Sequence, residues 1–318
     1  MQVIRGISQL NKALKNVVVA IGNFDGVHQG HQTILKTALE KARAIQGTAV
    51  AYTFRPHPQV ALRPATELQL LTTYDEKLEL IAAQGIQYLI EEPFSREFSS
   101  VAPHDFFNNV LMRKLSAQTV VVGYDFAFGK ERAGNLDALG EFCKSAGVEL
   151  IVVKAQRKDH EVVSSSRIRQ HLRGGEIEAA SQLLGREFFY RGIVIKGEGR
   201  GRQLGFPTAN LKIENKLTLP YGVYATWAMV DGHIYPSVTN IGVRPTFQGD
   251  GPELPALVEV HLLDQTLDLY GKTLEVRFAS RIRAERKFAG PNAIAELKTQ
   301  IGLDASKARE LLAAPAKK

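Results

Sequence analysis

The distribution of apolar runs changes near residue 186, and this change constrains the fold more than any other feature. Before it, short apolar runs alternate with helix-length amphipathic stretches, which predicts a parallel sheet with helices on both faces. After it, short strand-like runs follow one another between Gly and Pro, which is typical of a closed antiparallel barrel. Because 318 residues exceed what one core serves, we predict two domains, 1–186 and 187–318.

The expected elements can be given by residue number. In the first domain, we expect strands at 17–21, 48–54, 88–91, 119–122 and 149–153, and helices at 31–44, 75–83, 103–115 and 136–146. Two short helices, separated by Gly174 and Gly175, are expected within 164–185. In the second domain, we expect strands at 189–195, 221–229, 233–240, 257–263 and 274–278, a helical stretch at 291–312 broken near Gly302, and a disordered tail at 314–318. In such parallel sheets ligands bind beyond the carboxyl ends of the strands.

The first expected strand runs into Gly-Asn-Phe-Asp-Gly-Val-His-Gln-Gly-His at residues 22–31. Glycines let the backbone approach a ligand, and a helix starting near His28 would direct its free N–H groups and positive dipole end at phosphates. His28 and His31 lie three residues apart and would project side by side to donate hydrogen bonds. A zinc pair or two surface histidines are the alternatives, but the single cysteine, Cys143, and the scattered remaining histidines form no zinc-ligand cluster. This segment favours nucleotide chemistry.

Further motifs extend along the chain. They are Thr-Phe-Arg-Pro-His-Pro at 53–58, Val-Gly-Tyr-Asp-Phe-Ala-Phe-Gly at 122–129, Val-Ser-Ser-Ser-Arg-Ile-Arg at 163–169, Gly-Phe-Pro-Thr-Ala-Asn at 205–210, Asn-Ile-Gly-Val-Arg-Pro-Thr-Phe at 240–247 and Val-Glu-Val-His-Leu-Leu-Asp at 258–264. With residues 22–31, this series resembles the bacterial bifunctional riboflavin kinase/FAD synthetases over essentially the whole chain. The resemblance implies a Rossmann-like, doubly wound parallel sheet of nucleotidyltransferase type, followed by a flavokinase-type antiparallel β-barrel with a terminal helix.

For the first domain, the resemblance implies transfer of an adenylyl group from ATP to FMN, giving FAD and pyrophosphate. It places His28, His31 and Arg169 at the reacting phosphates. The residues it implies for nucleotide binding are Gly22, Asn23, Phe24, Asp25, Gly26, Asp125, Ser165 and Ser166. Ser166 departs from the usual Thr of the family but keeps the hydroxyl. From the residues alone, the serine run could be a plain helix cap and Asp125 a turn-forming residue.

The resemblance also implies a flavin site in the first domain, lined by Phe54, His57, Pro58 and Phe128. Aromatic and apolar side chains of this kind could wall an isoalloxazine ring. Any of these aromatic residues could instead belong to the core, and for Phe54 we favour the core.

For the second domain, the resemblance implies phosphorylation of riboflavin by ATP. Gly201 and Gly205 lie in a basic, glycine-rich loop at 197–205 that could wrap phosphates. Thr208 and Asn210 share one side of a strand and offer oxygen atoms to Mg²⁺, although cross-strand polar pairing is the alternative. Glu259 would accept the proton of the riboflavin hydroxyl, whereas without the resemblance a solvent-facing carboxylate is favoured. His261 has no predicted role, and no single residue of 281–287 is assigned to the flavin.

Charge is spread evenly: residues 1–186 hold 22 Lys and Arg against 19 Asp and Glu, and residues 187–318 hold 18 against 14. This spread argues against a nucleic-acid surface and suits small anionic substrates. No apolar run has membrane-spanning length, and no secretory signal is expected at the start. We therefore expect a cytoplasmic enzyme that uses riboflavin, FMN, ATP and Mg²⁺ without nucleic acid or membrane, and the sequence predicts no oligomeric state. The rivals are a single-activity nucleotidyltransferase and an RNA-binding regulator.

Overall fold

The computed structural model describes residues 1–63, 68–197, 199–214, 216–242 and 256–313. Its contacts divide the chain into two compact units, Met1–Ser165 and Ser166–Lys318. Residues 166–186 therefore group with the second unit, whereas the sequence analysis assigns them to the first domain. The boundary at 186/187 stays a prediction.

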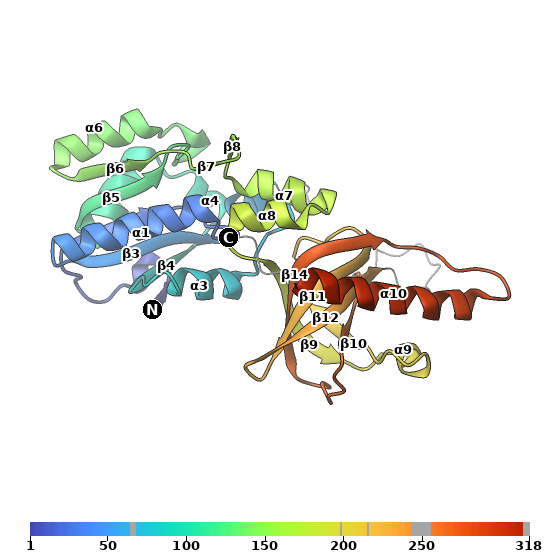
Figure 1. The fold of residues 1–318 in the computed structure, drawn as a ribbon. Coiled ribbons are helices and arrows are strands. Elements are labelled where there is room, and N and C mark those ends of the chain that lie inside the picture. Colours follow the sequence, from blue (N-terminus) through green and yellow to red (C-terminus); the bar gives the residue numbers. More distant parts are fainter. Residues whose placement is uncertain (64–67, 198, 215, 243–255, 314–318) are drawn as a thin grey trace. The chain divides into compact units, whose positions relative to one another are not determined.

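The first unit is built on a six-stranded, wholly parallel sheet in the order β1-β4-β3-β2-β5-β6 (Figure 1). Its strands are β1 (Gln2–Arg5), β2 (Val17–Ile21), β3 (Thr48–Arg55), β4 (Tyr88–Pro93), β5 (Ala117–Gly123) and β6 (Glu149–Val153). All five residues of β2 are buried because helices cover both faces of the sheet. A two-stranded hairpin, β7 (Arg157–Lys158) and β8 (Glu161–Val162), lies outside this sheet.

Two separate cores lie on the two faces of this sheet. On one face, α1 (Gln29–Ala44) and α3 (Tyr74–Ala82) pack against side chains that include Val18 and Ala20 of β2. On the other, Val17 and Val19 pack with the helical segment formed by α5 (Pro103–Phe106) and the π-helix η2 (Phe107–Lys114), and with α6 (Leu136–Ala146). Short helical turns complete the unit: η1 (Ile7–Gln9), α2 (Pro58–Leu62), α4 (Arg96–Ser99) and η3 (Lys130–Arg132). The expected doubly wound α/β arrangement is confirmed.

The second unit begins with two short helices and continues as a closed antiparallel barrel in the order β10-β13-β12-β11-β14-β9 (Figure 1). Its elements are α7 (Ser165–Gly174), α8 (Ile177–Leu184), β9 (Phe188–Ile195), α9 (Arg200–Gln203), β10 (Ala209–Ile213), β11 (Gly222–Val230), β12 (His233–Gly242), β13 (Leu257–Leu262), β14 (Thr273–Ala284) and α10 (Ala293–Ala313). The helix α10 packs Ala305 and Ala308 on the barrel wall, against Val223 and Ala225. The expected barrel with a terminal helix is confirmed.

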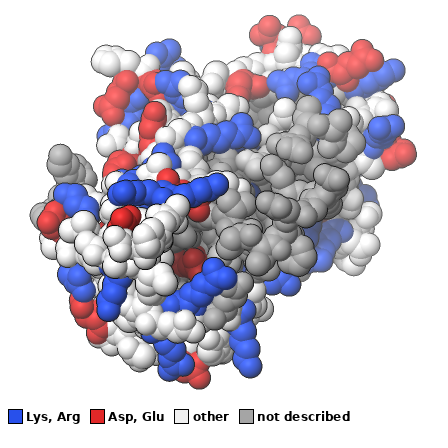
Figure 2. Space-filling model, turned by 90° about the vertical axis from the view of Figure 1, so that its right-hand side faces the viewer, with Lys and Arg blue, Asp and Glu red and all other residues white. Residues whose placement is uncertain are grey.

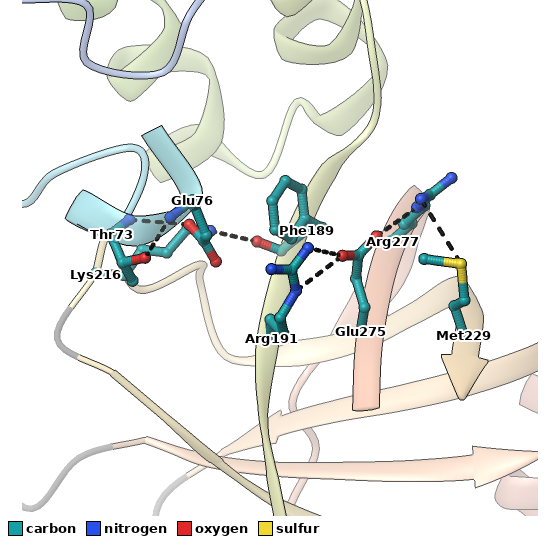
Figure 3. Close-up of polar contacts among 8 residues, drawn as sticks. All are labelled: Thr73, Glu76, Phe189, Arg191, Lys216, Met229, Glu275 and Arg277. Atoms are coloured by element: carbon teal, nitrogen blue, oxygen red, sulfur yellow. Dashed lines mark hydrogen bonds and ion pairs between the residues drawn. The ribbon is translucent and has the colours of Figure 1, made fainter. Parts of the chain in front are cut away.

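A cross-strand ion pair between Arg191 of β9 and Glu275 of β14, supported by Arg277 of β14, favours the observed register of these strands (Figure 3). Arg191 donates from Nε and Nη2 to one carboxylate oxygen of Glu275, at 3.0 and 2.7 Å, and Arg277 donates to the other at 2.8 Å. Nearby, the buried ammonium of Lys216 donates to the carbonyl of Phe189 at 2.6 Å. Because Glu275 is almost completely buried, a slip of one residue between the strands would remove Arg191 from its carboxylate and leave it with Arg277 of its own strand.

Some expected elements differ from the structure. The helix α10 continues through Gly302 without a break, because one glycine costs only about 1 kcal/mol in a helix that packing holds in place. The strand β14 extends six residues beyond 278, pairing with β11 across two bulges. The edge strand β1 was missed, since three of its four residues are exposed and form no apolar run.

Two findings concern the surface and hydropathy of the molecule. On the face drawn in Figure 2, basic and acidic side chains are interspersed over the part that the structure describes. Across the described ranges of the chain, no helix combines the length and the apolar character needed to cross a membrane.

Candidate active sites

The first candidate site lies where β2 runs into α1. His28 adopts an extended backbone conformation and caps α1, its Nδ1 atom accepting a hydrogen bond from the backbone N–H of His31 at 3.3 Å. The two imidazole rings stack with their centroids 3.6 Å apart. The expected pair of neighbouring histidines is confirmed, with His28 as the cap rather than part of the first turn.

His31 is prepared to act as a neutral imidazole. Burial lowers its pKa well below the ordinary value of 6.5, and the neighbouring charges of His28, Lys77 and His57 lower the pKa further. Phe24 meets the ring of His31 edge-on. The Nδ1 atom of His31 is buried and has no hydrogen-bond partner among the described residues. A neutral imidazole keeps one donor and one acceptor, so this ring can serve a ligand in either role.

The turn between β2 and α1 is held by hydrogen bonds to the segment that precedes α3. The buried carboxylate of Asp25 accepts hydrogen bonds from the backbone N–H groups of Leu71, at 3.0 Å, and Thr72, at 3.3 Å. The hydroxyl of Thr72 in turn accepts from the N–H of Gly26, and the ring of Phe24 is fully buried. These contacts stabilise the turn, and the assignment of Gly22, Asn23, Phe24, Asp25 and Gly26 to nucleotide binding stays a prediction.

The serine run reaches this turn directly. The hydroxyl of Ser165, the first residue of α7, donates to the carbonyl of Asp25 at 2.9 Å, although 140 residues separate them. Asp125 is exposed on the loop after β5. Ser166 and the buried Arg169 follow on α7 in the second unit. The nucleotide-binding and catalytic roles assigned to Ser165, Ser166, Asp125 and Arg169 stay predictions.

The residues assigned to the flavin fall into two groups. Phe54 is half-buried and packs against Tyr52, Phe94 and Phe98, with ring centroids 5.4 to 6.0 Å apart, which supports its place in the core. Phe128 stacks on Phe126 at 5.4 Å. His57 caps α2 through its Nδ1 atom, and Pro58 occupies the first turn of that helix. The role of Phe54, His57, Pro58 and Phe128 in binding a flavin stays a prediction.

The second candidate site is a cavity of about 570 Å³ in the second unit. Three kinds of segment line it: residues in and beside the glycine-rich loop, with Lys196 and Gly201; the barrel strands with Asn210 and Glu259; and the helix α10 with Asp304. Thr208 also lines the cavity, but it precedes β10, so the expectation that it shares a strand with Asn210 is wrong. The predicted metal ligands and the predicted base therefore share one cavity. Gly205, also assigned to nucleotide binding, follows the helix α9 with a φ of +89°; its role and that of Gly201 stay predictions.

Strand register places the polar residues of this cavity opposite one another. Asn210 of β10 pairs with Glu259 of β13, and Glu259 pairs on its other side with Asn240 of β12. The amide of Asn240 donates to the Glu259 carboxylate at 3.4 Å. Hydrogen bonds of this kind orient the carboxylate.

The structure gives roles to residues that the sequence left unassigned. The Nδ1 atom of His261 lies 2.8 Å from the carbonyl oxygen of Pro207, the residue before Thr208, and its ring meets Phe206 edge-on. Arg283, which also lines the cavity, donates to both carboxylate oxygens of the buried Asp304 at 2.7 to 3.1 Å and anchors α10. These pairs join residues 21 or more positions apart, so no local sequence signal could have indicated them.

Comparisons with known proteins match both units. The model of the FAD synthetase family matches residues 10–167, and that of the riboflavin kinase family matches residues 184–312. The bifunctional riboflavin kinase/FMN adenylyltransferase of Bacillus subtilis is 39% identical over 92% of this chain and 91% of its own length. The enzyme of the same name from Pseudomonas fluorescens is 36% identical over 98% of both chains. A crystal structure described as a macrolide-efflux protein from Streptococcus pneumoniae is 28% identical, with a TM-score of 0.87 over 97% of this chain and 99% of that one.

Proposed function

The chain belongs to the family of bifunctional riboflavin kinase/FMN adenylyltransferases, and from this premise we propose which residues carry out each of its two reactions. The protein phosphorylates riboflavin with ATP to give FMN, and it adenylylates FMN with a second ATP to give FAD and pyrophosphate. The FAD synthetase match covers the first reaction site described above, and the riboflavin kinase match covers the barrel. Two observations support the assignment of residues: His28 and His31 stack at the start of α1, and Thr208, Asn210 and Glu259 line one cavity of the second unit.

For adenylyl transfer, we propose that His28 and His31 stabilise charge on the ATP phosphates. The FMN phosphate attacks the α-phosphorus, the bond to the bridging oxygen breaks, and pyrophosphate leaves, so no covalent enzyme intermediate is needed. Negative charge then grows at the α-phosphate oxygens and on the leaving group. Hydrogen-bond donors fixed in advance by the stacked pair and the helix start stabilise that charge without reorganising. Ser165, Ser166, Arg169 and Asp125 are proposed to complete the nucleotide site.

For the kinase reaction, we propose Glu259 as the base that accepts the proton of the riboflavin hydroxyl as this oxygen attacks the γ-phosphorus of ATP. Thr208 and Asn210 offer neutral oxygen atoms beside it, and Mg²⁺ accepts such a sparse protein set because phosphate and water supply its other ligands. When bound, Mg²⁺ neutralises charge on the ATP phosphates. Over the described ranges of the chain, no group of three or more His, Cys, Asp or Glu side chains is arranged to hold a metal.

The proposed partners are the small molecules riboflavin, FMN and ATP. We also propose a cytoplasmic location, because a chain with the single cysteine Cys143 suits a reducing compartment.

The test follows both flavin products by chromatography. Purified protein with riboflavin, ATP and Mg²⁺ should yield FMN and FAD, and chelation of the metal should stop FMN formation. His28→Ala should accumulate FMN, with the exposed His104→Ala as the matched control. Glu259→Gln should form no FMN from riboflavin yet convert supplied FMN to FAD, with the exposed Glu214→Gln as its control. Normal FMN formation by Glu259→Gln would contradict its assignment as the base.

A further inference from the structure

A lysine that no motif contains is buried beside the first site. Lys77 lies on α3 with only 4% of its surface exposed. Its ammonium donates to the hydroxyl of Thr53 and to the carbonyl of Phe54, both at 3.1 Å, at the carboxyl end of β3. An ammonium removed from water costs several kcal/mol unless it is hydrogen-bonded and compensated by charge. An apolar residue would fill a core position without this desolvation cost, so the presence of a lysine here needs an explanation.

The hydrogen bonds of Lys77 continue to the turn that carries the histidines. The hydroxyl of Thr53, which accepts from Lys77, donates to the carbonyl of Asn23 at 3.1 Å. One residue earlier, the N–H of Gly22 donates to the carbonyl of Tyr52 on the same strand. The turn is thus held on one side by β3, through Thr53, and Thr53 is held by Lys77. Loss of the ammonium would release the Thr53 hydroxyl to rotate away from Asn23.

The helix that carries Lys77 is itself well fixed. The hydroxyl of Thr73 accepts from the N–H of Glu76, while the Glu76 carboxylate accepts from the N–H of Thr73, a reciprocal capping box. Lys77 follows directly in the first turn of α3. Because α3 is fixed in this way, Lys77 can hold the residues that it contacts in a defined position relative to the helix.

Lys77 also contributes charge. Its positive charge is one of the causes that lower the pKa of His31, together with burial, His28 and His57. The charges that act on Lys77 are those of Glu91, Asp25 and Arg55, and burial lowers its own pKa to about 8. Near neutral pH the ammonium is therefore still largely protonated.

We propose that Lys77 is a positioning residue of the adenylyl-transfer site: it holds the Asn23 end of the turn through Thr53 and places a fixed positive charge beside His31. The proposal rests on the assignment of His28 and His31 given above. Lys77 acts through these groups, and its two described hydrogen bonds are to the protein. A merely structural lysine would affect stability alone, whereas a positioning lysine also affects the rate of FMN adenylylation and the titration of His31.

The experiment compares Lys77→Met, Lys77→Arg and Thr53→Val in the full chain, with the exposed Lys36→Met as the matched control. FMN adenylylation is measured with supplied FMN, riboflavin phosphorylation serves as the internal standard, and the His31 ring is titrated by NMR, its signal assigned with His31→Gln. Lys77→Met should lose at least tenfold in kcat/KM for adenylylation and keep its kinase activity. Its His31 midpoint should move to higher pH, because a nearby positive charge has been removed.

The other variants separate the two parts of the proposal. Thr53→Val keeps the charge but breaks the bridge to Asn23, so adenylylation should fall while the His31 midpoint stays unchanged; this variant also tests the bridge if Lys77→Met fails to fold. Lys77→Arg should keep the His31 midpoint of the unaltered protein. Normal adenylylation in both Lys77→Met and Thr53→Val, or an unmoved His31 midpoint in Lys77→Met, would overturn the proposal. If His28→Ala itself retained FMN adenylylation, the assignment of the site would fail instead.

Discussion

The sharpest test of the kinase site is the substitution Gly197→Ala. A Cβ atom at Gly197 would lie 2.0 Å from the amide nitrogen of Asn210 and 2.6 Å from its Cγ, whereas ordinary contacts begin at 3.4 Å. The Asn210 amide would therefore have to move by about 3.4 − 2.0 = 1.4 Å, or the loop would have to move instead. A misplacement of about 1 Å in a positioning group costs roughly 10²-fold in rate, which corresponds to about 2.7 kcal/mol of transition-state stabilisation.

The assay measures riboflavin phosphorylation and FMN adenylylation in the same preparation. Gly197→Ala should lose about 10²-fold in kcat/KM for riboflavin phosphorylation and keep adenylylation unchanged. The control is Gly302→Ala in α10, where a Cβ would meet open space and alanine favours the helix. The single tryptophan, Trp227 on β11, reports whether the barrel remains folded. Unchanged phosphorylation by Gly197→Ala, or an equal loss of both activities, would refute the reasoning.

Three further predictions concern stability and reactivity. Asp304→Ala removes the partner of Arg283, whose side chain is 23% exposed, and should destabilise the barrel by about 3 kcal/mol, measured by urea unfolding of Trp227 fluorescence; a change below about 0.5 kcal/mol would show that α10 is held by its apolar contacts alone. Burial raises the pKa of Cys143 to about 11, so a thiol reagent at pH 8 should label it only after unfolding, and rapid labelling of the native protein would contradict its burial. Because burial lowers the pKa of Lys77 from 10.5 to about 8, the folded state binds fewer protons than the unfolded state between these pH values. The stability of the unaltered protein should therefore rise with pH across this window relative to Lys77→Met, by at most about 3 kcal/mol; parallel pH profiles in urea unfolding followed by circular dichroism would refute it.

The elements that could be predicted are those whose burial leaves a local pattern. The strand β2 is covered on both faces and appears in the sequence as an unbroken apolar run, so its bounds were predicted without error. The edge strand β1 has one buried residue and leaves no such run. The second half of β14 was missed because residues 279–284 hold Ile282 as their single large apolar residue and because its pairing with β11 depends on bulges. Local patterning therefore identifies strands that carry an apolar run, the edge strand β6 among them, and misses strands that carry none.

The candidate sites divide in the same way. His28, His31 and Glu259 lie in short motifs, so the sequence located them. The orientation of Glu259 depends on a hydrogen bond from Asn240, 19 positions away and opposite it in the barrel, and strand register cannot be read from spacing. Lys77 resembles any lysine of an amphipathic helix until the fold buries it. The sequence could not show which residues contact and orient the reactive groups, because these contacts form only in the tertiary structure.

The glycines of both motifs acquire a second explanation from these partners. The sequence suggested that they let the backbone approach a ligand. In the structure, a Cβ at Gly30 would lie 3.2 Å from the ring of His28, a tight contact, and a Cβ at Gly197 would collide with Asn210 at 2.0 Å. In each unit a glycine thus leaves the space that a predicted site residue occupies. In both folds, the lack of a side chain at the glycine leaves room for the neighbouring site residue to keep its position. Substitution of such a glycine should then impair one reaction of the enzyme and spare the other, whereas a general loss of stability would reduce both activities.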